Sequence, residues 1–239
     1  MSFPRIIHQS WKSSGLPGFL ARRISTVREK HPDWEHRFHT EADMEEVVAE
    51  CGVMPVEDFR RIPTEAGKED VFRCAVLFRD GGVYCDPALE AVKPLEEMFG
   101  MAVWDGFVSG GEELLMTVDH PVHCEVVHGQ DVVMNDFMVA MPRARFLGIY
   151  LGEVAAAARE GRLGGDPAES TGPLAISRMI DEHGGPSACG IALLPSSWVS
   201  PLPDMSLDFP EKDEYEGMIA SGSWRRKMDL YLVKGWGES

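Results

Sequence analysis

Apolar residues recur at helical spacing in residues 64–79, and the turn signal Asp80-Gly81-Gly82 follows directly. The next residues predict a short buried strand over 82–86 that ends in a carboxylate, Asp86. This unit of helix, turn and strand is the most regular pattern in the chain. It therefore gives the first candidate position for a functional site.

The rest of the pattern predicts strands and helices in alternation through the first half of the chain, which favours an α/β sheet. Residues 161–170 and 195–210 are expected to be loops, and no linker divides the chain, so we expect one domain over residues 1–239. Thr40 and Asp43 have the spacing of a helix N-cap. The expected strands are 3–11, 34–39, 103–109, 132–140, 191–194 and 229–234; the expected helices are 16–30, 40–50, 144–159 and 173–183.

The formal net charge of -16 disfavours nucleic acid and anionic membranes as general partners, because both would be repelled. No apolar run is long enough to predict a membrane span, and the N-terminus lacks a signal-peptide pattern. We therefore expect a cytoplasmic protein. Its five cysteines, an odd number without paired spacing, are expected to be reduced.

Asp70, Arg73 and Asp86 are the strongest candidate site residues. Asp70 and Arg73 are three residues apart on the predicted helix, so they share a face, and the helix leads directly into the strand that ends at Asp86. Ligands of open α/β sheets bind beyond the carboxyl ends of strands, where these groups would converge. Spacing alone favours an ordinary surface ion pair, with Asp86 as a turn residue, over a functional site.

Five segments together resemble the sugar-transferring glycosyltransferases of family 32, which include capsular and mannan-initiating enzymes and are similar to the catalytic domains of large clostridial toxins. The segments are FPRIIHQSWK, HPDWEHRFHTEADM, EDVFRCAVLFRDGGVYCDPALEAVKPL, NDFMVAMPRARFL and STGPL. The resemblance implies a GT-A-type fold, with a single Rossmann-like mixed sheet flanked by helices. It also implies a nucleotide-sugar donor (UDP- or GDP-sugar), a glycan or other hydroxyl acceptor, retention of anomeric configuration, a divalent cation (Mn²⁺ or Mg²⁺) and a role in polysaccharide biosynthesis.

The resemblance assigns roles to individual residues. Asp70, Arg73 and Asp86 are implied to be catalytic, with Asp70 on the donor sugar, Arg73 on the diphosphate and Asp86 on the metal. The implied substrate-binding residues are Trp11 (stacked on the base), Tyr84, Asn135, Thr171, Gly172, Lys234 and Trp236, and Ser239 joins Asp86 as a metal-side residue. No nucleophile is implied.

The chain departs from the family pattern at two positions. Ala88 stands where the second acid of the Asp-x-Asp motif would bind metal, and Lys234 stands where a histidine is often found. Three accounts remain open: an active enzyme with weakened metal dependence, in which Lys234 supplies positive charge; an engineered alanine that slows turnover; or an impaired relative that only binds a nucleotide sugar or a glycan.

Other patterns carry less weight. Asp119, His120, His123 and His128 are the densest histidine group, but their spacing fits no zinc motif, and Pro121 indicates a loop with exposed histidines. A nucleotidyltransferase is a further alternative, although the loop after the first strand lacks the expected glycine-rich basic sequence. The oligomeric state is not predicted.

Overall fold

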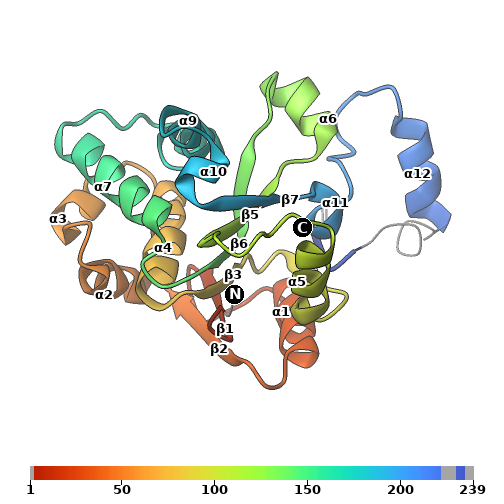
Figure 1. The fold of residues 1–239 in the computed structure, drawn as a ribbon, viewed down its shortest axis with the longest axis horizontal. Helices are drawn as coiled ribbons and strands as arrows, with labels where there is room; N and C mark the ends of the chain where they lie inside the picture. Colours follow the sequence, from red (N-terminus) through yellow and green to blue (C-terminus); the bar gives the residue numbers. More distant parts are fainter. Residues whose placement is uncertain (1–2, 222–229, 235–239) are drawn as a thin grey trace.

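A six-stranded mixed sheet with the order β2-β1-β3-β6-β5-β7 forms the centre of the protein (Figure 1). The computed structural model describes residues 3–221 and 230–234. β1 pairs in parallel with β2 and β3, whereas β6 runs antiparallel to β3 and β5. The strands of this sheet are β1 (Ile6–Trp11), β2 (Glu35–Thr40), β3 (Gly82–Cys85), β5 (Leu114–Val118), β6 (Val133–Ala140) and β7 (Ile191–Leu194).

Helices cover both faces of the sheet, which gives the three-layer arrangement expected from alternating strands and helices (Figure 1). One face packs against α2 (Glu41–Cys51), α4 (Glu65–Asp80), α7 (Arg145–Arg159) and α9 (Pro173–Glu182). The other face packs against α1 (Gly18–Lys30), α5 (Leu95–Trp104) and α11 (Ser196–Val199). The shorter helical elements are α3 (Val56–Arg60), α6 (Pro121–His123), the π-helical turn η1 (Cys124–His128), α8 (Pro167–Ser170), α10 (Pro186–Cys189) and α12 (Lys212–Ser221).

A second, two-stranded sheet joins β4 (Leu89–Ala91) to β8 (Leu232–Lys234). The pairing is antiparallel and sets Leu89 opposite Lys234. Because β4 begins three residues after Asp86, this pairing brings the end of the described chain beside the turn that follows β3. The small sheet therefore positions the last described residues against the candidate site.

The helix–turn–strand unit forms as predicted. Thr64 caps α4 by accepting a hydrogen bond from the Gly67 N–H (3.0 Å), and Thr40, the predicted N-cap of α2, forms a capping box with Asp43. All four residues of β3 are buried. Gly82 has φ of +90°, and a Cβ there would lie 2.5 Å from the Ile6 carbonyl oxygen, so β1 and β3 approach each other where only glycine fits.

The predicted strand at 103–109 is wrong. Leu95, Met98 and Ala102 recur at helical spacing and are buried against the sheet, so this segment forms α5 and then a loop. The strand that enters the sheet is β5, which begins at Leu114. The expected loops at 161–170 and 195–210 also contain the short helices α8 and α11.

Candidate active site

Arg73 lies at the centre of a polar cluster at the carboxyl end of β3. Its Nη2 donates to Asp86 Oδ2 (3.0 Å), its Nη1 donates to the carbonyl oxygen of Asn135 (3.3 Å), and its guanidinium lies 5.0 Å from the centroid of the Tyr84 ring. Burial alone would lower the pKa of Arg73, but the surrounding Asp86 and Asp70 hold it above its ordinary value. Arg73 is therefore a fixed cation with a planar array of donors, which suits phosphate or sugar oxygens.

Asp70 lies one turn before Arg73 and faces the same space. Its Oδ1 accepts from Asn135 Nδ2 (2.8 Å), and its Oδ2 accepts from Thr171 Oγ1 (3.2 Å). Burial raises the pKa of Asp70, while Arg73 and these two hydrogen bonds oppose the rise. Gly172 packs closely here, because an added Cβ would lie 3.1 Å from Asp70 Oδ2 and from the backbone of α8, tighter than most Cβ contacts.

The end of β1 borders the same cluster. The Ser10 and Tyr84 hydroxyls are hydrogen-bonded (2.9 Å), which holds the Tyr84 ring under Arg73. Trp11, the last residue of β1, is half-buried, as a base-stacking ring would need to be. The structure thus brings six predicted residues into one cluster, with Trp11 at its border: Asp70, Arg73, Tyr84, Asp86, Asn135 and Thr171.

Two buried polar atoms of this cluster, Arg73 Nε and Asp136 Oδ1, have no hydrogen-bond partner among the residues that the structure describes. The other buried side-chain atoms without such a partner belong to Gln9, Trp11 and His36. Buried polar groups are rarely left unpaired, so the cluster indicates where a polar ligand would complete the hydrogen bonds.

Ala88 and Asp86 form a tight turn. The Ala88 N–H donates to Asp86 Oδ1 (2.9 Å), and the Leu89 N–H donates to the Asp86 carbonyl oxygen (2.9 Å). Across the sheet, the Asp86 N–H donates to the carbonyl oxygen of Asp136 (2.9 Å), so the two aspartates are neighbours on adjacent strands. Asp136 Oδ2 accepts from Lys234 Nζ (3.0 Å), and Asp136 raises the pKa of Lys234 against the effect of burial.

This donor set does not fit a divalent cation. Both carboxylate oxygens of Asp86 already accept N–H donors, Ala88 offers no oxygen, and Asp136 is paired with an ammonium. Within residues 3–221 and 230–234, no group of three or more histidine, cysteine or acidic residues could hold a metal ion. Hard cations need several oxygen ligands, which this arrangement does not supply.

Two predicted residues, Trp236 and Ser239, lie outside the described residues. Sequence reasoning missed two residues of the cluster, Ser10 and Asp136. Asp136 had a usable signal, since it directly follows Asn135 in the segment NDF. Ser10 lies within the first strand, but nothing in the sequence pairs it with Tyr84.

The predicted loop of exposed histidines is wrong. Pro121 begins helix α6 rather than interrupting one, and His120 and His123 are buried. His123 Nδ1 donates to Asp119 Oδ1 (2.9 Å), and its Nε2 accepts from the Asp204 N–H (2.8 Å). Proline is well suited to the first turn of a helix. The hydrogen bonds of His123 connect the loop that contains Asp204 to Asp119 at the end of β5.

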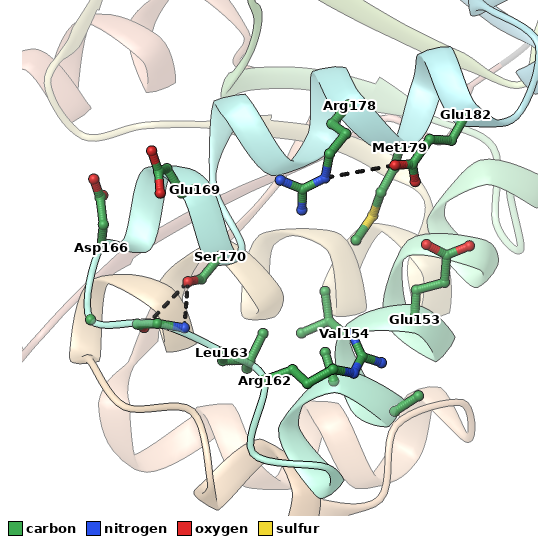
Figure 2. A pocket seen from close by; sticks show the side chains of 14 residues that line it. Glu153, Val154, Arg162, Leu163, Asp166, Glu169, Ser170, Arg178, Met179 and Glu182 are labelled. Atoms are coloured by element: carbon green, nitrogen blue, oxygen red, sulfur yellow. Dashed lines mark hydrogen bonds and ion pairs between the residues drawn. The ribbon is translucent and has the colours of Figure 1, made fainter.

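A separate cavity of about 760 Å³ lies among α7, α8 and α9 (Figure 2). Its lining is mixed: Val154 and Met179 lie among charged groups that include Arg162 and Glu169. Asp70, Arg73 and Asp86 do not line it, although α8 borders both places, because Ser170 faces the cavity and Thr171 contacts Asp70. The cavity is therefore distinct from the Arg73 cluster.

Residues 19–103 match the family model described as "Glycosyltransferase sugar-binding region containing DXD motif". The matched segment contains Asp70, Arg73 and Asp86, and the predicted resemblance to this family is confirmed. Glycosyltransferases with this motif generally use a divalent cation, whereas the donor set around Asp86 described above does not fit one.

Two yeast proteins are similar in sequence. Inositol phosphoceramide mannosyltransferase 1 of Schizosaccharomyces pombe is 30% identical over 149 residues, which cover 58% of this chain and 46% of that protein. Inositol phosphoceramide mannosyltransferase 2 of the same species is 29% identical over 184 residues, which cover 75% of this chain and 47% of that protein. The chain thus spans about half the length of these curated relatives.

A solved structure described as "PaToxG Glycosyltransferase" shares the fold, with a TM-score of 0.55 and 12% identity over 75% of this chain and 69% of that chain. The predicted GT-A-type α/β fold is confirmed. No helix in the described part of the chain is long and apolar enough to cross a bilayer.

Proposed function

We propose that this chain, which carries the sugar-binding region of the DXD glycosyltransferases on a GT-A-type fold, transfers a sugar from a nucleoside-diphosphate sugar to a hydroxyl acceptor with retention. One observation carries the proposal. Arg73 Nε and Asp136 Oδ1, two buried polar atoms without a hydrogen-bond partner among the described residues, lie where the fold brings Asp70, Arg73 and Asp86 together.

The roles follow from position and chemistry. Arg73 would bind the diphosphate, and Asp70, which already holds Asn135 and Thr171, would accept hydrogen bonds from sugar hydroxyls. Trp11 would stack on the base from the end of β1. In the reaction the bond from the anomeric carbon to the diphosphate oxygen breaks and a bond to the acceptor oxygen forms. The departing diphosphate takes the electron pair and then the acceptor's proton, since no side chain is assigned as nucleophile.

The relatives suggest the sugar. Both yeast proteins are mannosyltransferases by name, so we propose nucleotide-activated mannose as the first donor to test, with other UDP- and GDP-sugars beside it. A cytoplasmic location, a role in polysaccharide biosynthesis and a single domain over residues 1–239 remain predictions.

The experiment incubates the purified chain with each donor and an acceptor panel, and measures both released nucleoside diphosphate and glycosylated product. We expect release with one donor, a product that keeps the anomeric configuration by NMR, and loss of about 10²-fold or more in Arg73→Ala, because that variant removes a charge-stabilising donor. The matched control is Arg60→Ala, whose exposed arginine pairs with Glu45. Donor binding without any release would favour the alternative, an impaired relative that only binds. Normal transfer by Arg73→Ala would overturn the role of Arg73.

A further inference from the structure

We propose that the Lys234 ammonium, held by Asp136, takes the place of the divalent cation and binds the donor diphosphate directly. This inference rests on the proposed function, because it concerns how the same site receives its donor. It starts from the mismatch between a motif that generally uses a metal and a donor set that does not fit one.

The first argument is topological. β8 pairs with β4 so that Lys234 lies opposite Leu89, the residue that follows Ala88. The chain thus has no carboxylate at position 88 and has an ammonium on the strand next to it. A cation delivered by the protein needs no metal-binding acid at that position, so the two departures from the family pattern account for each other.

The second argument is that a buried carboxylate fixes the position of the Lys234 ammonium. Asp136 is 5% exposed, and its Oδ2 lies 3.0 Å from Lys234 Nζ. Asp136 neighbours Asp86 through the backbone hydrogen bond between β6 and the end of β3, so its partner Lys234 is held beside the Arg73–Asp86 pair. A lysine on a flexible stem loses side-chain entropy when it is fixed, and a buried carboxylate offsets that cost.

The third argument is charge. Arg73 and Lys234 each bring one positive charge, together equal to that of one divalent cation; Arg73 pairs with Asp86 and lies 4.0 Å from Glu69, and Lys234 pairs with Asp136. Fixed cations aimed at the position where charge develops can stabilise a leaving diphosphate as a metal does. Asp136 Oδ1 has no partner within the described residues and remains available to a donor hydroxyl or to water.

Binding tests the inference separately from turnover. Calorimetry would measure the affinity for UDP and GDP with EDTA and with Mn²⁺, in the wild-type chain, in Lys234→Met and in the control Lys68→Met, whose lysine pairs with Glu65 on the surface of α4. Methionine keeps the apolar stem of lysine and removes the charge. We expect one nucleotide to bind equally well with EDTA and with Mn²⁺, and Lys234→Met to weaken that binding by about 10- to 100-fold, the range of one to two lost charge-assisted hydrogen bonds.

A second set of variants guards against misfolding. Lys234→Met leaves Asp136 buried without its partner, so Lys234→Met/Asp136→Asn removes both charges, and thermal unfolding checks each protein. Adding Ala88→Asp to the double variant should create binding that EDTA abolishes and Mn²⁺ restores.

The outcomes separate the two proposals. If wild-type nucleotide binding is lost in EDTA and restored by Mn²⁺, the inference is overturned while the proposed transferase stands. Metal-independent, Lys234-dependent binding without turnover of any donor would support the inference and overturn the transferase. Failure to bind either nucleotide in any condition would overturn both.

Discussion

Asp70 combines deep burial with three polar partners, which makes it the residue whose charge can be tested most cleanly. Asp70→Asn keeps the shape and can still accept from Asn135, but it removes the carboxylate that would hold donor hydroxyls. We expect sugar transfer to fall by about 10²- to 10³-fold, the usual cost of losing one catalytic polar group. The free energy of unfolding should hold or rise, because burial already raises the pKa of Asp70 by disfavouring its charged form.

The control for this prediction is Asp181→Asn, which changes an exposed acid on α9. Initial rates at saturating donor and urea unfolding would be measured for both variants. Full transfer activity in Asp70→Asn would exclude the carboxylate charge from the reaction, whereas a large loss of stability would show that the charge holds the fold together.

At the scale of residues, sequence reasoning succeeded where the geometry is local. Asp70, Arg73 and Asp86 lie on one helix–turn–strand unit, so their convergence follows from helical spacing and one short turn. Asp136 and Ser10 were missed because their contacts are with strand neighbours that lie far away in sequence. The roles of all these residues stay predictions until variants are measured.

Among the elements, the turn from α4 into β3 depends on two glycines with positive φ, Gly81 and Gly82. We expect Gly82→Ala to lower the free energy of unfolding by about 3 kcal/mol or more, because the new Cβ would meet the Ile6 carbonyl in a strained backbone. Gly52→Ala is the matched control. It has φ of +73° with open space around it, and should cost only about 1 kcal/mol.

Urea unfolding of the two variants would measure this difference. Equal losses would mean that backbone conformation alone, and not the close approach of β1 and β3, requires glycine at position 82. Since β3 carries Tyr84 and leads into Asp86, we also expect Gly82→Ala to weaken donor binding.

The helices and strands could be predicted where one face is buried and the caps are explicit, as in α2 and α4. The strand predicted at 103–109 was wrong because the start of this segment continues a helix that begins at Leu95. A short apolar run does not distinguish a strand from a buried helix by its periodicity. The pairing of β4 with β8 joins segments more than 140 residues apart, and no local signal specifies it.

For the whole molecule, the fold class followed from alternation, but the order of the strands did not. β6 runs antiparallel between β3 and β5, a choice set by packing on both faces of the finished sheet. That placement brings Asn135 and Asp136 to the carboxyl end of β3. The candidate site is therefore a property of the complete sheet as well as of its most regular segment.

The whole molecule should also lose stability on mild acidification. Burial lowers the pKa of five of the eight histidines, and the strongest case is His8, at about 3. His8 Nε2 donates to the Gly81 carbonyl (3.1 Å) and its Nδ1 accepts from His39 Nε2 (3.1 Å), an arrangement that needs the His8 ring neutral. Below pH 6.5 the unfolded chain binds protons at these residues and the folded chain does not, so the free energy of unfolding falls with pH.

Each such histidine contributes up to about 1.4 kcal/mol per pH unit to the slope of the free energy of unfolding against pH. The raised pKa values of Glu69 and Asp70 act in the opposite direction, because these two acids bind protons more readily in the folded chain. Because the histidines outnumber these two acids, we expect urea unfolding to show decreasing stability from pH 7 through pH 6 to pH 5. His8→Gln, whose amide extends to the position of Nε2 and can still donate to the Gly81 carbonyl, should make the slope shallower by up to one proton whatever its effect at pH 7. A slope that is unchanged in His8→Gln would show that His8 is protonated equally in both states, and that a neutral His8 does not link β1 and β2 to the turn before β3.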